Sequence, residues 1–130
     1  MTATDGATVL RTVLVADDDP DLLALIQRRL SRAGYRVICA IDGQEALDMV
    51  AEHHPDMAVL DVTMPKVTGT EVLARLRADS ATSEMLVILI SANYRGEFND
   101  RGRPLGADDY IPKPFGPAEI RNRVEVLFDR

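Results

Sequence analysis

The alternation of two hydrophobic patterns is the feature of this chain that most restricts its fold. Short apolar runs rich in β-branched residues alternate with stretches in which apolar residues recur at helical spacing. The runs occupy residues 10–16, 35–40, 56–60, 85–90 and 109–111. Strands that alternate with helices form βαβ units, in which helices cover both faces of a parallel sheet. We therefore predict an α/β domain with a doubly wound, five-stranded parallel sheet.

Capping residues mark the helices between these runs. Aspartate is a favoured N-cap, proline is a favoured first helical residue, and glycine commonly follows a helix end. In the first helix, Leu22, Ile26 and Leu30 recur at helical spacing. The predicted helices extend from Asp19–Pro20 to Gly34, from Asp42 to Pro55, from Gly69 or Thr70 onwards, and from Pro117 onwards.

The segment between the fourth and fifth apolar runs, residues 93–105, interrupts this pattern. A crossover helix is expected there, yet the segment contains two glycines and a proline. In a helix interior a glycine costs about 1 kcal/mol and a proline about 3 kcal/mol. We therefore expect helix four to be short, irregular or mobile. Two readings stay open: a frayed helix without consequence, or a basic surface ordered by a partner and formed by Arg95, Arg101 and Arg103.

Composition and charge exclude several classes of protein. The 21 acidic and 15 basic residues give a net charge of -6, which argues against direct binding to nucleic acid. The longest strongly apolar run, residues 85–90, is far shorter than the roughly 20 residues of a membrane span. The single cysteine, Cys39, cannot form an internal disulfide. We expect a cytoplasmic protein without membrane insertion, with a flexible tail over residues 1–9.

Polar residues follow the predicted strands where each strand ends. They are Asp17, Asp18 and Asp19 after the first strand, Asp61 after the third, Ser91 after the fourth and Lys113 after the fifth. Ligands of open parallel sheets bind beyond the carboxyl ends of the strands. Clustered carboxylates without a Cys/His group suit Mg²⁺, and a carboxylate can itself be phosphorylated. Asp19 alone reads as a helix cap, but the set together predicts a phosphoryl-transfer site.

At these residues the chain resembles the receiver domain of a two-component response regulator, of the single-domain, chemotaxis-regulator-like kind. The matching stretches are VLVADDDP at 13–20, LDVTMP at 60–65, ISA at 90–92, GADDY at 106–110 and KPF at 113–115. Each stretch is weakly specific, but all five in this order are highly specific. The resemblance implies a receiver domain over residues 10–130 and the flavodoxin-like strand order 2-1-3-4-5.

The resemblance also implies an acceptor and a metal site. Asp61 would accept a phosphoryl group from a histidine kinase or a histidine phosphotransfer protein. Asp17 and Asp18 would hold Mg²⁺, with Mn²⁺ as an alternative ion. The Asp61 carboxylate and the main-chain carbonyl of Thr63 would complete the protein ligands.

Further positions would respond to phosphorylation or set the lifetime of the phosphorylated form. By resemblance, Ser91 would hydrogen-bond the phosphoryl group and Lys113 would pair with it. Tyr110 would be the aromatic switch residue that rotates inward when Ser91 moves. Thr63 and Asn93 would flank the path of the attacking water and set the lifetime of the acyl phosphate. Neither is a strong general base, so we expect ordinary or slow autodephosphorylation.

The turn after Met64 and Pro65 departs from the family pattern. A glycine is common at the next position, where this chain has Lys66, while Gly69 is retained. We expect the lysine to change the surface charge beside the site without removing a ligand.

We predict a phosphorylation-activated switch that catalyses only its own phosphotransfer and autodephosphorylation, and so is not an enzyme. We expect no output domain after Arg130, so that the protein would bind a downstream protein or pass its phosphoryl group on, as a monomer or a phosphorylation-dependent dimer. Two alternatives stay open. One is a protein-binding module of the same fold that ignores phosphorylation. The other is an aspartyl-phosphate phosphohydrolase, which is disfavoured because Thr63 stands where those enzymes carry a second aspartate.

Overall fold

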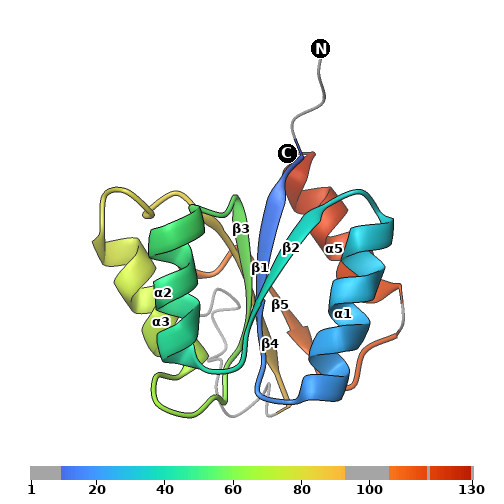
Figure 1. The fold of residues 1–130 in the computed structure, drawn as a ribbon, viewed down its shortest axis with the longest axis horizontal. Coiled ribbons are helices and arrows are strands. Elements are labelled where there is room, and N and C mark those ends of the chain that lie inside the picture. Colours follow the sequence, from blue (N-terminus) through green and yellow to red (C-terminus); the bar gives the residue numbers. More distant parts are fainter. Residues whose placement is uncertain (1–9, 93–105, 117, 130) are drawn as a thin grey trace.

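Five parallel strands form the central layer of the computed structural model, which describes residues 10–92, 106–116 and 118–129 (Figure 1). The strands are β1 (Thr12–Ala16), β2 (Arg36–Ala40), β3 (Met57–Asp61), β4 (Leu86–Ser91) and β5 (Asp109–Pro112). They pair in the order β2-β1-β3-β4-β5, and every pair is parallel. The predicted α/β fold and its strand order are confirmed.

The described helices cover both faces of this sheet. Helices α1 (Pro20–Arg32) and α5 (Glu119–Phe128) lie on one face, and α2 (Gly43–His53) and α3 (Gly69–Ala78) lie on the other (Figure 1). The predictions for helix four and for the N-terminal tail fall on residues 93–105 and 1–9, outside the described residues. Among the helices of the described segments, none has the length and apolar character needed to cross a membrane.

The apolar core is divided by the sheet into two halves. All five residues of β1 are buried, and alternate side chains point to opposite faces. Val13 and Val15 belong to the half that contains Ile26 of α1, whereas Leu14 belongs to the half that contains Leu73 of α3. Burial on both faces explains why the strands read as continuous apolar runs. It also makes the sheet a rigid support for residues at its edge.

The predicted helix caps are present. The Asp19 carboxylate accepts hydrogen bonds from the main-chain nitrogens of Asp21 at 3.0 Å and Leu22 at 3.4 Å. The Asp42 carboxylate accepts one from the nitrogen of Glu45 at 2.7 Å and so caps α2. Each cap satisfies a main-chain donor in the first helical turn. The two connections that lead away from the carboxyl edge after β1 and β2 are thereby fixed in direction.

Candidate functional site

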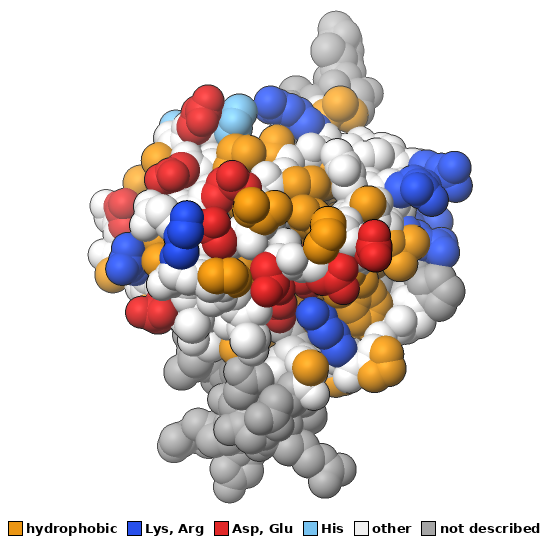
Figure 2. All heavy atoms as spheres, turned by 60° about the horizontal axis from the view of Figure 1, so that its bottom comes forward, with side chains coloured by type: hydrophobic (Ala, Val, Ile, Leu, Met, Phe, Trp, Pro, Cys, Tyr) orange, Lys and Arg blue, Asp and Glu red, His pale blue; other side chains and the backbone are white. Residues whose placement is uncertain are grey.

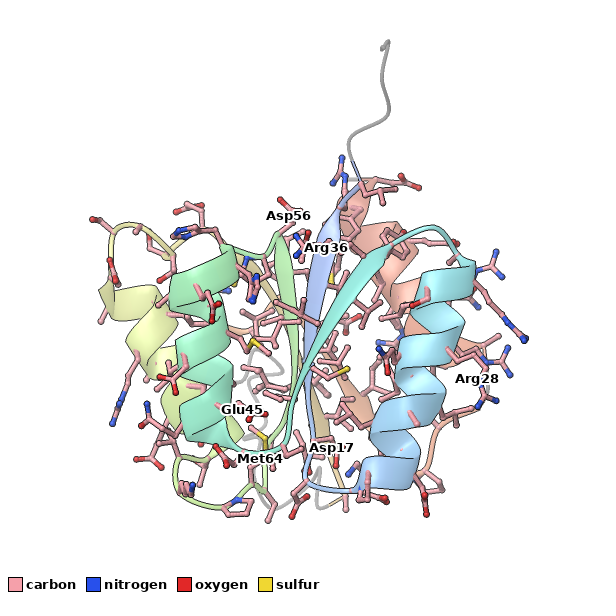
Figure 3. All side chains as sticks on the ribbon, viewed as in Figure 1. Asp17, Arg28, Arg36, Glu45, Asp56 and Met64 are labelled. Atoms are coloured by element: carbon pink, nitrogen blue, oxygen red, sulfur yellow. The ribbon has the colours of Figure 1, made fainter. Side chains whose placement is uncertain are left out.

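Three carboxylates meet at the carboxyl edge of the sheet. Asp17 follows the last residue of β1, and Asp61 is the last residue of β3. One carboxylate oxygen from each of Asp17, Asp18 and Asp61 lies within 4.8 Å of the others. Asp17 and Asp61 are buried, while Asp18 is exposed. Figure 3 shows Asp17 at the lower end of the sheet near the start of α1, and Figure 2, with this edge turned forward, shows acidic side chains gathered there.

Lys113 brings a positive charge to the same group. Its Nζ lies 3.3 Å from Oδ2 of Asp17 and 3.5 Å from Oδ2 of Asp61. Its main-chain nitrogen donates to the carbonyl of Ser91 at 2.8 Å, which holds the residue against the end of β4. Burial opposes the charged ammonium, but the carboxylates of Asp61 and Asp17 outweigh it, so the pKa of Lys113 is raised. The lysine is therefore held as a cation among the carboxylates.

One lysine does not fully compensate the buried carboxylates. Burial and the neighbouring carboxylate of Asp17 raise the pKa of Asp61 to about 6. The Lys113 ammonium and the main-chain N–H of Thr63, which donates to Oδ1 of Asp61 at 3.4 Å, act in the opposite direction. The ionised form of Asp61 is thus less favourable in the protein than in water. A further cation at this position would stabilise it.

The donor set fits a small divalent cation. Oδ1 of Asp17 accepts a hydrogen bond from the nitrogen of Asp19 at 2.9 Å. Oδ2 of Asp17 is buried and receives no aligned hydrogen bond from the described residues, although it has the ion-pair contact with Lys113. The Lys113 ammonium offsets part of the cost of burying this oxygen, and a bound metal ion would offset more of it. The described group contains oxygen donors and neither cysteine nor histidine, which is the chemistry of a Mg²⁺ site.

Three of the four remaining predicted residues, Ser91, Tyr110 and Thr63, lie within the described part of the chain. Ser91 is buried at the end of β4, directly after Ile90, the register partner of Asp61. Tyr110 is half-buried on β5 and packs against the core half that contains α2 and α3. Thr63 is exposed, two residues beyond Asp61. The fourth such position, Asn93, lies outside the described residues.

Sequence reasoning missed why Gly69 is needed. The glycine is the first residue of α3, and its nitrogen donates to the carbonyl of Val62 at 2.9 Å. A Cβ built at this position would overlap the main-chain carbonyl of Asp61. The residue thus allows α3 to start directly against the main chain of Asp61. The only signal in the sequence is a glycine at a helix start, and a helix start alone does not reveal this contact.

Comparison with known proteins identifies the family to which the chain belongs. The family profile described as the response regulator receiver domain matches residues 13–125. The chain is 42% identical over 121 residues to the alkaline phosphatase synthesis transcriptional regulatory protein PhoP of Bacillus subtilis, covering 92% of this chain and 49% of that protein. It is 44% identical over 120 residues to the transcriptional regulatory protein PrrA of Mycobacterium tuberculosis, covering 91% and 50%. The chain spans about half the length of these curated relatives.

A solved structure gives the same result in three dimensions. The receiver domain of the Francisella response regulator 1452 superposes with a TM-score of 0.83 at 35% sequence identity, covering 92% of this chain and 98% of that one. The family profile, which matches residues 13–125, includes the positions of Asp17, Asp61 and Lys113. The fold, the acidic edge with its lysine and the family profile agree, and the chain belongs to the family of response regulator receiver domains.

Proposed function

We propose that this receiver domain is switched by phosphorylation of Asp61. The observation that carries the proposal is the position of the Asp61 carboxylate, 3.5 Å from the Lys113 ammonium and within 4.8 Å of carboxylate oxygens of Asp17 and Asp18. A carboxylate oxygen of Asp61 would attack the phosphorus of a phosphohistidine. The new P–O bond forms as the P–N bond breaks, and the departing imidazole nitrogen keeps the electron pair and takes up a proton.

The acidic group would hold Mg²⁺ through Asp17, Asp18, Asp61 and the main-chain carbonyl of Thr63, with Mn²⁺ as an alternative. The bound ion would neutralise charge on the phosphoryl oxygens. Asp17 is oriented for this role by its hydrogen bond from the nitrogen of Asp19. Lys113, already beside Asp61, would pair with another phosphoryl oxygen.

The phosphoryl group would then bias a conformational equilibrium. It adds a charge of about -1.5 to -2 and strong acceptor oxygens. Ser91, at the end of the neighbouring strand, would donate a hydrogen bond to one of those oxygens, and Tyr110 would move inward with it. The ligand shifts the population because it interacts differently with the two states.

The same proposal covers the lifetime and the partners of the phosphorylated form. Thr63 and Asn93 would limit access of water to the acyl phosphate, so unchanged hydrolysis in both Thr63→Ala and Asn93→Ala would contradict this role. The domain would turn over no separate substrate. Its phosphodonor would be a histidine kinase or histidine phosphotransfer protein in the cytoplasm, and its output a downstream protein, with monomeric or phosphorylation-dependent dimeric assembly.

Intact mass after incubation with acetyl phosphate and Mg²⁺ tests the proposal, with Asp61→Asn as the control. We expect one added phosphoryl group that is absent in the variant and absent without metal. No adduct in the wild type, even with a histidine kinase as donor, would overturn the phosphorylation role. The protein would then be a binding module that does not depend on phosphorylation.

A further inference from the structure

The loop between β3 and α3, residues 62–68, packs against the N-terminus of α2. The carbonyl of Pro65 accepts hydrogen bonds from the nitrogen of Val67 at 2.8 Å and from that of Gly43, the first residue of α2, at 3.4 Å. A Cβ on Gly43 would overlap the carbonyl of Val67, so the two segments are in main-chain contact. In Figure 3, Met64 of the loop and Glu45 of α2 lie at this same end of the molecule.

Lys66 holds an unusual conformation in this loop. Its φ angle is 70°, in the left-handed region that residues other than glycine rarely adopt. By resemblance to the receiver family, a glycine is common at this position. Such a conformation persists when surrounding contacts hold it. The sequence expectation, a change of surface charge alone, does not explain why a lysine occupies this position.

An ion pair with Asp42 supplies such a contact. Nζ of Lys66, whose side chain is 68% exposed, lies 3.6 Å from Oδ2 of Asp42, whose side chain is 12% exposed. The other oxygen, Oδ1, accepts the capping hydrogen bond from Glu45 at 2.7 Å. One carboxylate therefore caps α2 and pairs with the lysine of the loop. Because the capping hydrogen bond fixes the orientation of Asp42, its Oδ2 offers the Lys66 ammonium one defined position.

The other end of the loop is fixed beside the acidic group. The nitrogen of Thr63 donates to Oδ1 of Asp61, and the nitrogen of Gly69 donates to the carbonyl of Val62 at 2.9 Å. The residue whose carbonyl would bind the metal, Thr63, thus lies between the contact with Asp61 and the contact with α2. A loop held at both ends has few ways to turn that carbonyl away.

We propose that the Lys66–Asp42 ion pair positions the β3–α3 loop so that the main-chain carbonyl of Thr63 is presented to the metal. The proposal rests on the metal site of the proposed function. Lys66 and Asp42 are positioning residues, since they act through the loop and the cap. In this chain the ion pair stabilises the left-handed conformation at position 66, which a glycine would adopt without steric cost.

Three variants separate positioning from charge. Lys66→Met removes the ammonium but keeps a side chain in the left-handed conformation. Lys66→Gly also removes the ammonium but adopts that conformation without steric cost. Asp42→Asn removes the charge and keeps a side-chain oxygen for the cap of α2. If Lys66 acted only by its charge, both lysine variants would bind Mg²⁺ equally well and at least as tightly as the wild type, because a positive charge near the site is lost.

Isothermal titration of the unphosphorylated, metal-free protein with Mg²⁺ measures the effect. We expect Lys66→Met and Asp42→Asn each to weaken Mg²⁺ binding roughly two- to fivefold, the range for an exposed ion pair. Lys66→Gly should remain close to the wild type. The double variant Asp42→Asn/Lys66→Met should be no weaker than either single variant, because both remove the same contact.

Amide hydrogen exchange without metal gives a second readout. Exchange at the nitrogens of Val67 and Gly69, which are hydrogen-bonded within the loop region, should accelerate in Lys66→Met and stay unchanged in Lys66→Gly. Unchanged or tighter Mg²⁺ binding in Lys66→Met would overturn the positioning role, as would equal behaviour of the methionine and glycine variants. No phosphodonor is used, so failure of Asp61 to accept a phosphoryl group would not alter these results. A wild type that binds no Mg²⁺ would overturn the metal site and the positioning role together.

Discussion

Nζ of Lys113 lies 3.5 Å from Oδ2 of Asp61, although β4 lies between β3, which ends at Asp61, and β5, which Lys113 follows. The contact depends on the strand order, which makes β3 and β5 the two neighbours of β4. It also depends on the hydrogen bond from the Lys113 nitrogen to the carbonyl of Ser91, which fixes where the chain leaves the sheet. The charge state of Asp61 is therefore set in part by a residue far away in the sequence.

Replacing Lys113 with methionine should raise the pKa of Asp61 above its value of about 6, because the ammonium favours the ionised carboxylate. Titration of the Asp61 side-chain carboxyl by carbon-13 NMR in metal-free buffer measures this pKa directly. Lys113→Arg is the matched control, since it keeps a cation at the position. An unchanged pKa in Lys113→Met would show that the ion pair has no influence on the acceptor.

The raised pKa of Asp61 predicts a pH-dependent stability. The native state binds the proton more tightly than the unfolded chain, whose aspartate has a pKa near 3.8. Stability from this group is therefore lost as the pH rises from about 4 through about 6, by about 3 kcal/mol in the metal-free protein. Asp61→Asn should be more stable than the wild type near pH 7.5 and should lose this advantage near pH 4.

Urea unfolding of both proteins in the presence of a chelator tests this at the two pH values. Saturating Mg²⁺ near pH 7.5 should reduce the advantage of Asp61→Asn, because a cation stabilises the wild-type carboxylate. A stability difference that is the same at both pH values would contradict the assigned burial of charge.

A methyl group at position 69 should destabilise the fold. The Cβ of Gly69→Ala would overlap the main-chain carbonyl of Asp61, and main chain cannot move aside as a flexible side chain can. We expect a loss of about 1–3 kcal/mol in the free energy of unfolding. Gly116→Ala is the control, because a Cβ there would meet nothing within 4 Å. Equal stability of the two variants in urea titrations would show that α3 can shift away from Asp61.

Arg77 should be required for stability at the opposite edge of the sheet. Its guanidinium donates to the carbonyls of Met85 at 2.7 Å, Ser83 at 3.1 Å and Gly106 at 3.1 Å, and to Oδ2 of Asp108 at 3.1 Å. A lysine ammonium cannot reproduce these hydrogen bonds from several guanidinium nitrogens, so Arg77→Lys should lower the free energy of unfolding by about 2 kcal/mol. Arg75→Lys on the exposed side of the same helix should cost less than about 0.5 kcal/mol. Comparable losses in chemical denaturation would contradict the assigned role of the hydrogen bonds.

The sequence was sufficient to predict the acidic edge because the topology decides where strand ends meet. Asp61 ends one parallel strand, Asp17 and Lys113 directly follow two others, and parallel strands end at one edge. The caps at Asp19 and Asp42 were predictable because they depend on local main-chain donors. These features depend either on neighbouring residues or on the strand order, and the residue pattern predicts both.

Contacts between distant main-chain segments could not be predicted in the same way. The left-handed conformation of Lys66 and the steric requirement at Gly69 depend on how loops pack against α2 and β3. The buried face of α1 is centred on Leu23, Ile26 and Leu30, whereas Leu22 is only half-buried. Which of the two adjacent leucines is buried depends on how α1 packs against β2 and α5. The cis peptide bond between Lys113 and Pro114 could not be predicted either, because the sequence shows only that a proline follows Lys113.

The main-chain contact between Gly43 and Val67 has a consequence for anyone who wishes to exchange parts between proteins of this fold. A loop transplanted from another domain would bring its own residue opposite Gly43, while α2 would keep a capping aspartate with no lysine to pair with. The β3–α3 loop and the first turn of α2 depend on each other's residues for their packing, although they are separate in the sequence. Chimeras should therefore be cut so that residues 42–43 and 62–69 come from the same parent.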